Sequence, residues 1–153
     1  MLTGFQTAGA GVTNGSRTVT LTWAAPAVTS VTVLDPTASV KVKTGTTNSF
    51  KVVVKDQFGT GMAGEKVTPS LDADSSNYSA TTSYASVTTD ANGVATWSLT
   101  DATAAAGADY VTFTSVTNSA KASSAFTLTY VATLPVLASF LSYYNLDAGA
   151  TAS

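Results

Sequence analysis

The side chains that could carry out chemistry in this 153-residue chain are few, and the most reactive types are absent. The sequence contains no His and no Cys, so it lacks the commonest general base, the commonest metal ligand and any thiolate. A serine nucleophile would need a lysine as its base, and the lysines fall at outward positions of alternating segments. These residue types predict a protein that is not an enzyme.

A hard cation such as Ca²⁺ binds to clustered oxygen ligands. Asp72 and Asp74 form a close pair of acids in a polar stretch, and Asp35 precedes Pro36 near a predicted domain joint. The spacing matches neither an EF-hand loop nor an acidic nonapeptide repeat, and a solvated loop explains the pair equally well. Asp72, Asp74 and Asp35 are weak candidate calcium ligands, and no other cofactor is expected.

The low charge of the chain limits the partners that it can bind and indicates where it is located. Lys and Arg number 7, Asp and Glu number 9, and charged residues make up only 10% of the chain. The sequence shows no basic cluster for nucleic acid and no apolar run of the roughly 20 residues that a membrane-spanning helix needs. Ser and Thr supply the polar surface instead of charges, which favours an extracellular or cell-surface location, with a virion surface as the alternative.

Five segments alternate between apolar and polar residues with a period of two, which is typical of half-buried β-strands. In one of them, Phe50, Val52 and Val54 share a face that we expect to be buried, and both Trp23 and Trp97 fall on apolar faces of theirs. Val and Thr, which are β-branched, dominate and favour strands over helices. The segments are 18–23, 49–55, 94–99, 110–114 and 125–130.

Turn signals separate these segments, at 35–36, 43–45, 56–59 and 90–93. We count about seven strands between residues 28 and 131, with no helical units between them. That pattern predicts an all-β protein, an antiparallel immunoglobulin-like β-sandwich with Greek-key connections.

An internal repeat suggests a tandem arrangement. Val12-Thr13-Asn14 is followed by Thr20-Leu21-Thr22-Trp23, and Val116-Thr117-Asn118 by Thr127-Leu128-Thr129-Tyr130, so the two TLT blocks lie 107 residues apart. That offset is about the length of one immunoglobulin-like domain. We therefore expect residues 1–25 to be the closing hairpin of a preceding domain or an N-terminal assembly segment, 26–133 one complete domain, and 134–153 a linker, a tail or the start of a following element.

Two motifs in the middle of the chain resemble bacterial immunoglobulin-like domains of the invasin and intimin type. Residues 52–68 resemble the family's strand, turn and second strand, and residues 88–96 (TTDANGVAT) its T-D-x-x-G-x-A tight turn. Gly93 can supply a positive φ at the hairpin, and Asp90 can cap the amides that follow it. The structural turn residues of the two motifs are Asp56, Gly59, Gly64, Asp90, Asn92 and Gly93.

The resemblance implies a non-enzymatic structural or adhesive module of an extracellular surface protein. Such a module acts as a spacer and assembly unit in a stalk, a surface layer or a filament. A phage virion decoration or tail protein with the same fold is the alternative. The implied partners are neighbouring copies or adjacent immunoglobulin-like domains, with a host-surface protein as a further candidate. A third interpretation, glycan binding, rests on the aromatic side chains and not on the resemblance, and exposed tyrosines such as Tyr78 and Tyr84 would contact the glycan.

The C-terminal segment is the most apolar and aromatic-rich stretch of the chain. Its apolar residues fit helical spacing, and an extended strand fits them equally. Either way they need cover, so we expect them to contact a partner. The candidate interaction residues are Val136, Leu137, Phe140, Leu141, Tyr143 and Tyr144.

Overall fold

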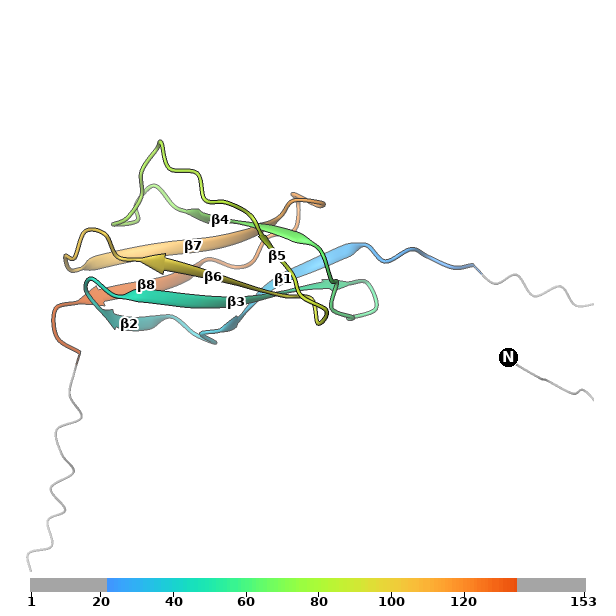
Figure 1. The fold of residues 1–153 in the computed structure, drawn as a ribbon, viewed down its shortest axis with the longest axis horizontal. Coiled ribbons are helices and arrows are strands. Elements are labelled where there is room, and N and C mark those ends of the chain that lie inside the picture. Colours follow the sequence, from blue (N-terminus) through green and yellow to red (C-terminus); the bar gives the residue numbers. More distant parts are fainter. Residues whose placement is uncertain (1–21, 135–153) are drawn as a thin grey trace, which may run out of the picture.

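Every regular element in the part of the chain that the computed structural model describes, residues 22–134, is a β-strand (Figure 1). This part contains no helix long and apolar enough to cross a membrane. Turns and irregular segments connect the strands. Along the chain they are β1 Val28–Asp35, β2 Val40–Lys43, β3 Thr47–Asp56, β4 Lys66–Leu71, β5 Val87–Thr88, β6 Val94–Thr100, β7 Gly107–Ser115 and β8 Phe126–Val131.

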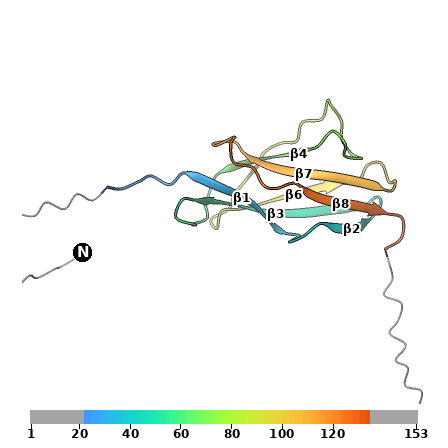
Figure 2. The same ribbon diagram turned by 180° about the vertical axis from the view of Figure 1, so that it is seen from behind.

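The strands form two sheets that face each other across the core (Figures 1 and 2). One sheet has the order β1-β3-β6 and the other the order β2-β8-β7-β4-β5. Neighbours such as β3 and β6, or β4 and β7, are not consecutive in the sequence, so the connections cross between the sheets as in a Greek key. The predicted all-β immunoglobulin-like sandwich is confirmed.

One pair of strands departs from the purely antiparallel sheet that the sequence predicted. Strand β2 runs parallel to β8, with Val40 opposite Leu128 and Lys43 opposite Val131. The physical reason lies at Pro36, which has no N–H for the ladder that β1 forms with β3. The chain therefore leaves the first sheet after β1 and continues in the same direction as β2, in the second sheet. This switch and the two-residue β5 bring the strands to eight rather than about seven.

Alternation along β3 shows how the sequence builds the core. Phe50, Val52 and Val54 are fully buried, and the interleaved Lys51 and Lys55 are exposed, as the period-two pattern predicted. The inward residues of the second sheet complete the same cluster from the opposite side. Those that are at most 1% exposed are Val67, Val111, Phe113, Leu128 and Tyr130.

An aromatic cluster fills the centre of the core. The Phe50 ring lies 5.4 Å from that of Phe126, 5.6 Å from that of Phe113 and 5.8 Å from that of Trp97, measured between ring centroids. Tyr84 then packs edge-on against Trp97 at 5.3 Å. Each such pair stabilises a core by about 0.5–1.5 kcal/mol beyond the area that it buries. The prediction that Trp97 belongs to the core is confirmed, because its ring packs against the buried cluster.

Trp23 does not belong to the core that residues 22–134 form. Residues 22–27 precede β1 without forming a strand, and the Trp23 side chain is 89% exposed. The alternation identified its apolar face, but no described strand lies beside Trp23 to cover it. The rest of the predicted strand 18–23 lies outside the described residues, and the domain limits 26 and 133 stay a prediction.

Candidate functional site

The chain enters and leaves the sandwich at opposite ends (Figures 1 and 2). Residues 22–27 lead into β1 at what we call the leading end, which also carries the turns at 57–60 and 90–93. Strand β8 finishes at the other, trailing end, where the amide of Thr44 donates to the carbonyl of Val131 at 3.1 Å. These two ends are where the domain can meet whatever precedes and follows it.

A turn stabilised by Asp56 forms part of the leading end. The Asp56 carboxylate is 6% exposed and accepts hydrogen bonds from the amides of Phe58 and Thr60, both at 2.9 Å. Gly59 adopts a φ of 79°, which a glycine reaches without strain. The turn leaves the Phe58 side chain 65% exposed at the tip of the domain.

The second turn of the leading end is stabilised by Asp90. Its carboxylate oxygen accepts the amides of Asn92 at 2.8 Å and Val94 at 3.0 Å. Gly93 has a φ of 77°, and a Cβ built on it would lie 2.5 Å from the backbone nitrogen of Met62. The two turn motifs that the sequence singled out are therefore in direct backbone contact, which leaves no room for a side chain at Gly93.

Thr89 ties the segment before β4 to the Asp90 turn. Its hydroxyl donates to the carbonyl of Met62 at 2.6 Å and accepts the amide of Glu65 at 2.9 Å. Its carbonyl accepts the amide of Gly64, whose φ is 76°, at 3.0 Å. These contacts fix the backbone of the leading end through one short side chain.

The trailing end holds a buried polar network that the sequence did not reveal. Asp109 of β7 is fully buried. Its carboxylate accepts three hydrogen bonds of 2.8 Å, from the Tyr130 hydroxyl and from the backbone and side-chain nitrogens of Asn77. The Asn77 amide also donates to Asp101 at 3.2 Å, which links both acids. The network joins the loop after β4 to strands β7 and β8.

Asp101 completes this network. It is 3% exposed and accepts the amide of Gly45 at 2.9 Å and the Thr103 hydroxyl at 2.8 Å. Burial by itself raises the pKa of Asp101, but the hydrogen bonds from Gly45, Thr103 and Asn77 outweigh it and hold that pKa below its ordinary value. Every buried polar side-chain atom among residues 22–134 has a partner. The network is thus satisfied internally and aims no free group at a ligand.

Burial also affects the tyrosines that face Asp109. Burial, and then the hydrogen bond to Asp109, raise the pKa of Tyr130. Burial, and then the charge of Asp109, raise the pKa of Tyr84. Both hydroxyls therefore keep their protons across the physiological pH range, and Tyr130 remains the hydrogen-bond donor that the Asp109 carboxylate requires.

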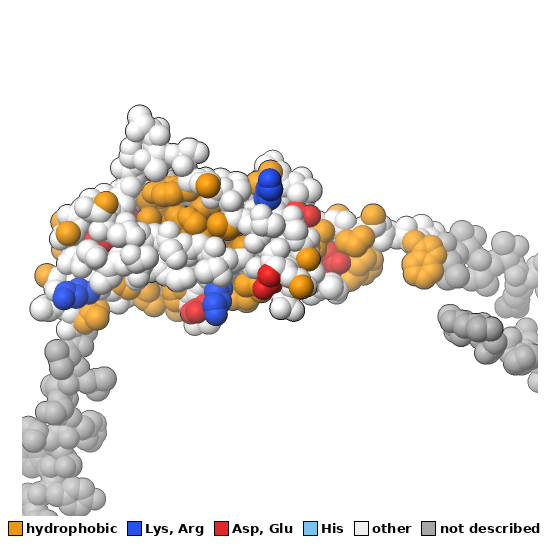
Figure 3. Space-filling model, in the orientation of Figure 1, with side chains coloured by type: hydrophobic (Ala, Val, Ile, Leu, Met, Phe, Trp, Pro, Cys, Tyr) orange, Lys and Arg blue, Asp and Glu red, His pale blue; other side chains and the backbone are white. Residues whose placement is uncertain are grey.

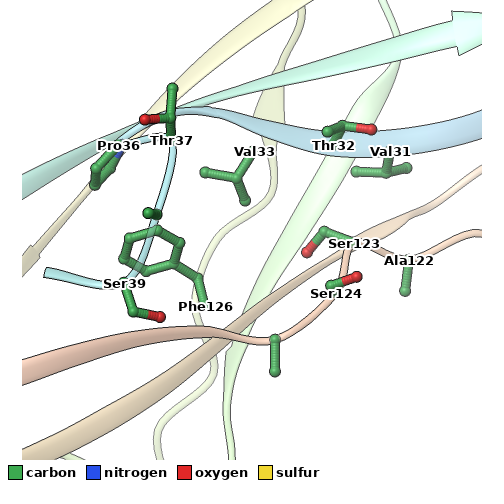
Figure 4. A pocket seen from close by; sticks show the side chains of 12 residues that line it. Val31, Thr32, Val33, Pro36, Thr37, Ser39, Ala122, Ser123, Ser124 and Phe126 are labelled. Carbon is green, nitrogen blue, oxygen red and sulfur yellow. The ribbon is translucent and has the colours of Figure 1, made fainter.

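A cavity of about 360 Å³ lies between β1 and the segment that leads into β8 (Figure 4). Val33 and Phe126 form its apolar part, while Ser39, Ser123 and Ser124 line its rim (Figure 4). No acid, lysine or arginine lines it. It therefore offers no acid–base pair for catalysis.

A second cavity, of about 310 Å³, lies between β4 and the long loop that follows it. Tyr78, which is 44% exposed, and Tyr84 both line it, together with hydroxyl side chains such as Thr68 and Ser70. The structure thus brings together the two tyrosines that the sequence analysis named as possible glycan contacts. Binding of a glycan there stays a prediction.

The weak calcium candidates do not come together. Asp72 and Asp74 form a local turn in which the Asp72 carboxylate accepts the amide of Asp74 at 3.0 Å, and Asp35 ends β1. Within the described ranges, no three acids gather into a group that could bind a metal ion. The candidate interaction residues Val136, Leu137, Phe140, Leu141, Tyr143 and Tyr144 lie outside the described residues.

No protein-family model matches the chain. No curated protein matches it significantly either. Similar solved structures exist for the S-layer protein SbsC. One is 25% identical with a TM-score of 0.50, and the match covers 73% of this chain and 14% of that one. SbsC domains 1–6 are 24% identical with a TM-score of 0.50, and the match covers 74% of this chain and 14% of that one.

The D00-D0 domain of intimin is also similar, at 20% identity and a TM-score of 0.45, with 68% of this chain and 46% of that one covered. This chain thus spans a small part of the SbsC chains and about half of the intimin structure. The likeness to the SbsC structures, at a TM-score of 0.50, shows the fold alone. It does not distinguish the invasin and intimin type from other immunoglobulin-like domains, so that assignment stays a prediction.

Proposed function

We propose that this chain is a non-enzymatic structural module of an extracellular surface protein, in which it acts as a spacer and assembly unit within a tandem array. The observation that carries this proposal is the placement of the chain's entry and exit at opposite ends of the sandwich (Figures 1 and 2). Domains joined in this way continue in line, and a series of them makes an extended rod.

Two further observations support the array. The TLT block of β8 recurs 107 residues upstream, at about the period of one domain. The solved structures that resemble the chain at a TM-score of 0.50 are parts of the S-layer protein SbsC, which has several domains. A surface layer is therefore the setting that we favour over a stalk or a filament. The virion alternative has no comparable support.

The chemistry of the described residues fits a role without catalysis. The two buried acids of the trailing end are fully hydrogen bonded, and neither of the two cavities described above is lined by an acid or a lysine. The Lys and Arg side chains lie apart from one another on the face seen in Figure 3, so this face offers no basic patch for nucleic acid.

Antibodies raised against the folded domain test this proposal on intact cells of the source organism. We expect them to label the cell surface, and protease treatment of intact cells to remove the signal. We also expect the native antigen to be much larger than 15.4 kDa and to yield limited-digestion fragments spaced by about one domain. Antigen confined to the cell interior would contradict the proposal.

A further inference from the structure

We propose that Gln57 locks the three residues 25–27 into a stiff joint, and that this joint connects the domain to a preceding immunoglobulin-like domain whose last strand ends near Trp23. This inference rests on the proposed tandem array and adds to it the residue that sets the direction of the chain between two domains.

The joint is held by two complementary hydrogen bonds from one side chain. The Gln57 amide nitrogen donates to the carbonyl of Ala25 at 2.8 Å, and its oxygen accepts the amide of Ala27, also at 2.8 Å. Gln57 is 30 residues from Ala27 in the sequence, so the contact ties the incoming chain to the β3 turn. A primary amide is suited to this task because it offers a donor and an acceptor side by side.

The segment held by Gln57 is stiff by composition as well. Pro26 fixes its own φ near −65° and biases Ala25 towards an extended conformation. Pro26 also has no N–H, so Ala27 supplies the donor that follows the proline. A second side-chain amide strengthens the attachment next to it, because Asn118 donates to the carbonyl of Val28 at 3.1 Å, where β1 begins.

The internal repeat indicates what precedes this joint. Aligning the two TLT blocks places Trp23 at the position of Tyr130, which is 1% exposed in the core of this domain and lies one residue before the end of β8. By this alignment the last strand of a preceding domain ends at Ala24. Residues 25–27 are then the whole linker, and β1 starts at Val28.

The exposed side chains at the leading end fit such a partner. Phe58 is 65% exposed and Val116 53%, and Figure 3 shows hydrophobic side chains gathered at this end beside the incoming segment. A linker of only three residues would bring a preceding domain against this end and cover these groups. The partner that this surface fits is thus the last strand and end loops of another immunoglobulin-like domain.

Nuclear magnetic resonance of the isotopically labelled full chain tests the lock directly. In the native sequence we expect the Ala27 amide to be as rigid as the strands, with an order parameter of about 0.85. Gln57→Ala should lower it below about 0.6 and speed hydrogen exchange at Ala27 by about fivefold. Gln57→Glu keeps an acceptor for the Ala27 amide, but its carboxylate cannot donate to Ala25. At neutral pH we expect the Ala27 amide of this variant to be intermediate between the native sequence and Gln57→Ala, and to regain full rigidity below about pH 4.3, where a protonated acid donates again.

Asn48→Asp is the matched control, since it makes the same amide-to-acid change at the other end of β3, where Asn48 donates to the carbonyl of Thr46. It should leave the Ala27 amide unchanged. An unaltered Ala27 amide in Gln57→Ala, or the absence of a pH rescue in Gln57→Glu, would overturn the lock. These measurements are made on the single chain. Their outcome therefore does not depend on the outcome of the antibody experiment, which tests the array.

Discussion

The two ends of the sandwich differ in the kind of side chain that they bury and the kind that they expose. The trailing end buries its polar groups, Asp109 and Asp101, and satisfies them within the domain. The leading end leaves the apolar side chains of Trp23 and Phe58 exposed while fixing its backbone by short turns. It follows that the trailing end stabilises the domain by itself, whereas the leading end has a rigid backbone and an apolar surface that a neighbour can cover.

The largest effect should come from breaking the trailing end. Asp109→Ala removes the acceptor of three hydrogen bonds, which leaves the buried Tyr130 hydroxyl without its partner and takes two hydrogen bonds from Asn77. We expect the free energy of unfolding to fall by about 4 kcal/mol in urea denaturation. The exposed Asp72→Ala should cost less than about 1 kcal/mol. Similar losses in the two variants would mean that the buried network does not stabilise the fold.

A pair of glycines tests how tightly the backbone of the leading end is packed. Gly93 and Gly59 have almost the same φ, 77° and 79°, but a Cβ meets the Met62 backbone at Gly93 and nothing within 4 Å at Gly59. Gly59→Ala should therefore lower the free energy of unfolding by about 1 kcal/mol, because of the backbone conformation alone. Gly93→Ala should cost about 3 kcal/mol in thermal or urea unfolding, because the contact adds to the conformational term. Equal costs would show that the two turns are not in contact.

The sequence predicted which residues point into the core better than it predicted the hydrogen bonds between residues that lie far apart in the chain. Phe50, Val52 and Val54 followed from alternation, because a strand's period of two assigns faces without knowledge of its neighbours. Asp109 also left a signal, since it shares the inward face of β7 with apolar residues. Its partner Asn77 left none, because the two lie 32 residues apart and meet only when the loop folds back.

Local patterns do not report distant partners, and this also explains what the sequence analysis missed at the leading end. Alternation placed Trp23 on an apolar face, but a periodic pattern does not say which element covers that face. Gln57 was read as part of a turn, and its contacts with Ala25 and Ala27 depend on the path of the incoming chain. Pro36 signals the break after β1, but no local pattern reports that the chain then pairs in parallel with β8.

The smallest expected effect is on the pH dependence of stability, and it comes from Asp101 at the trailing end. The folded-state pKa of Asp101 is lowered, so its contribution to stability is present above the ordinary value of 3.8 and is lost as the pH falls through the lower folded value. Asp101→Asn should flatten the acid limb of a stability-versus-pH curve below about pH 4. The control Asp74→Asn, in an exposed loop, should leave that limb unchanged. An identical acid limb for native protein and Asp101→Asn would contradict the assignment.

Hydroxyl-radical footprinting of the native surface protein and of the isolated 153-residue chain tests the central claim most directly. Trp97 serves as an internal reference, because it packs against the core of this domain in both samples. If the leading end is a junction between domains, Trp23 and Phe58 will react readily in the isolated chain and will be several-fold protected in the native protein. Equal reactivity of Trp23 and Phe58 in the two samples would contradict the account.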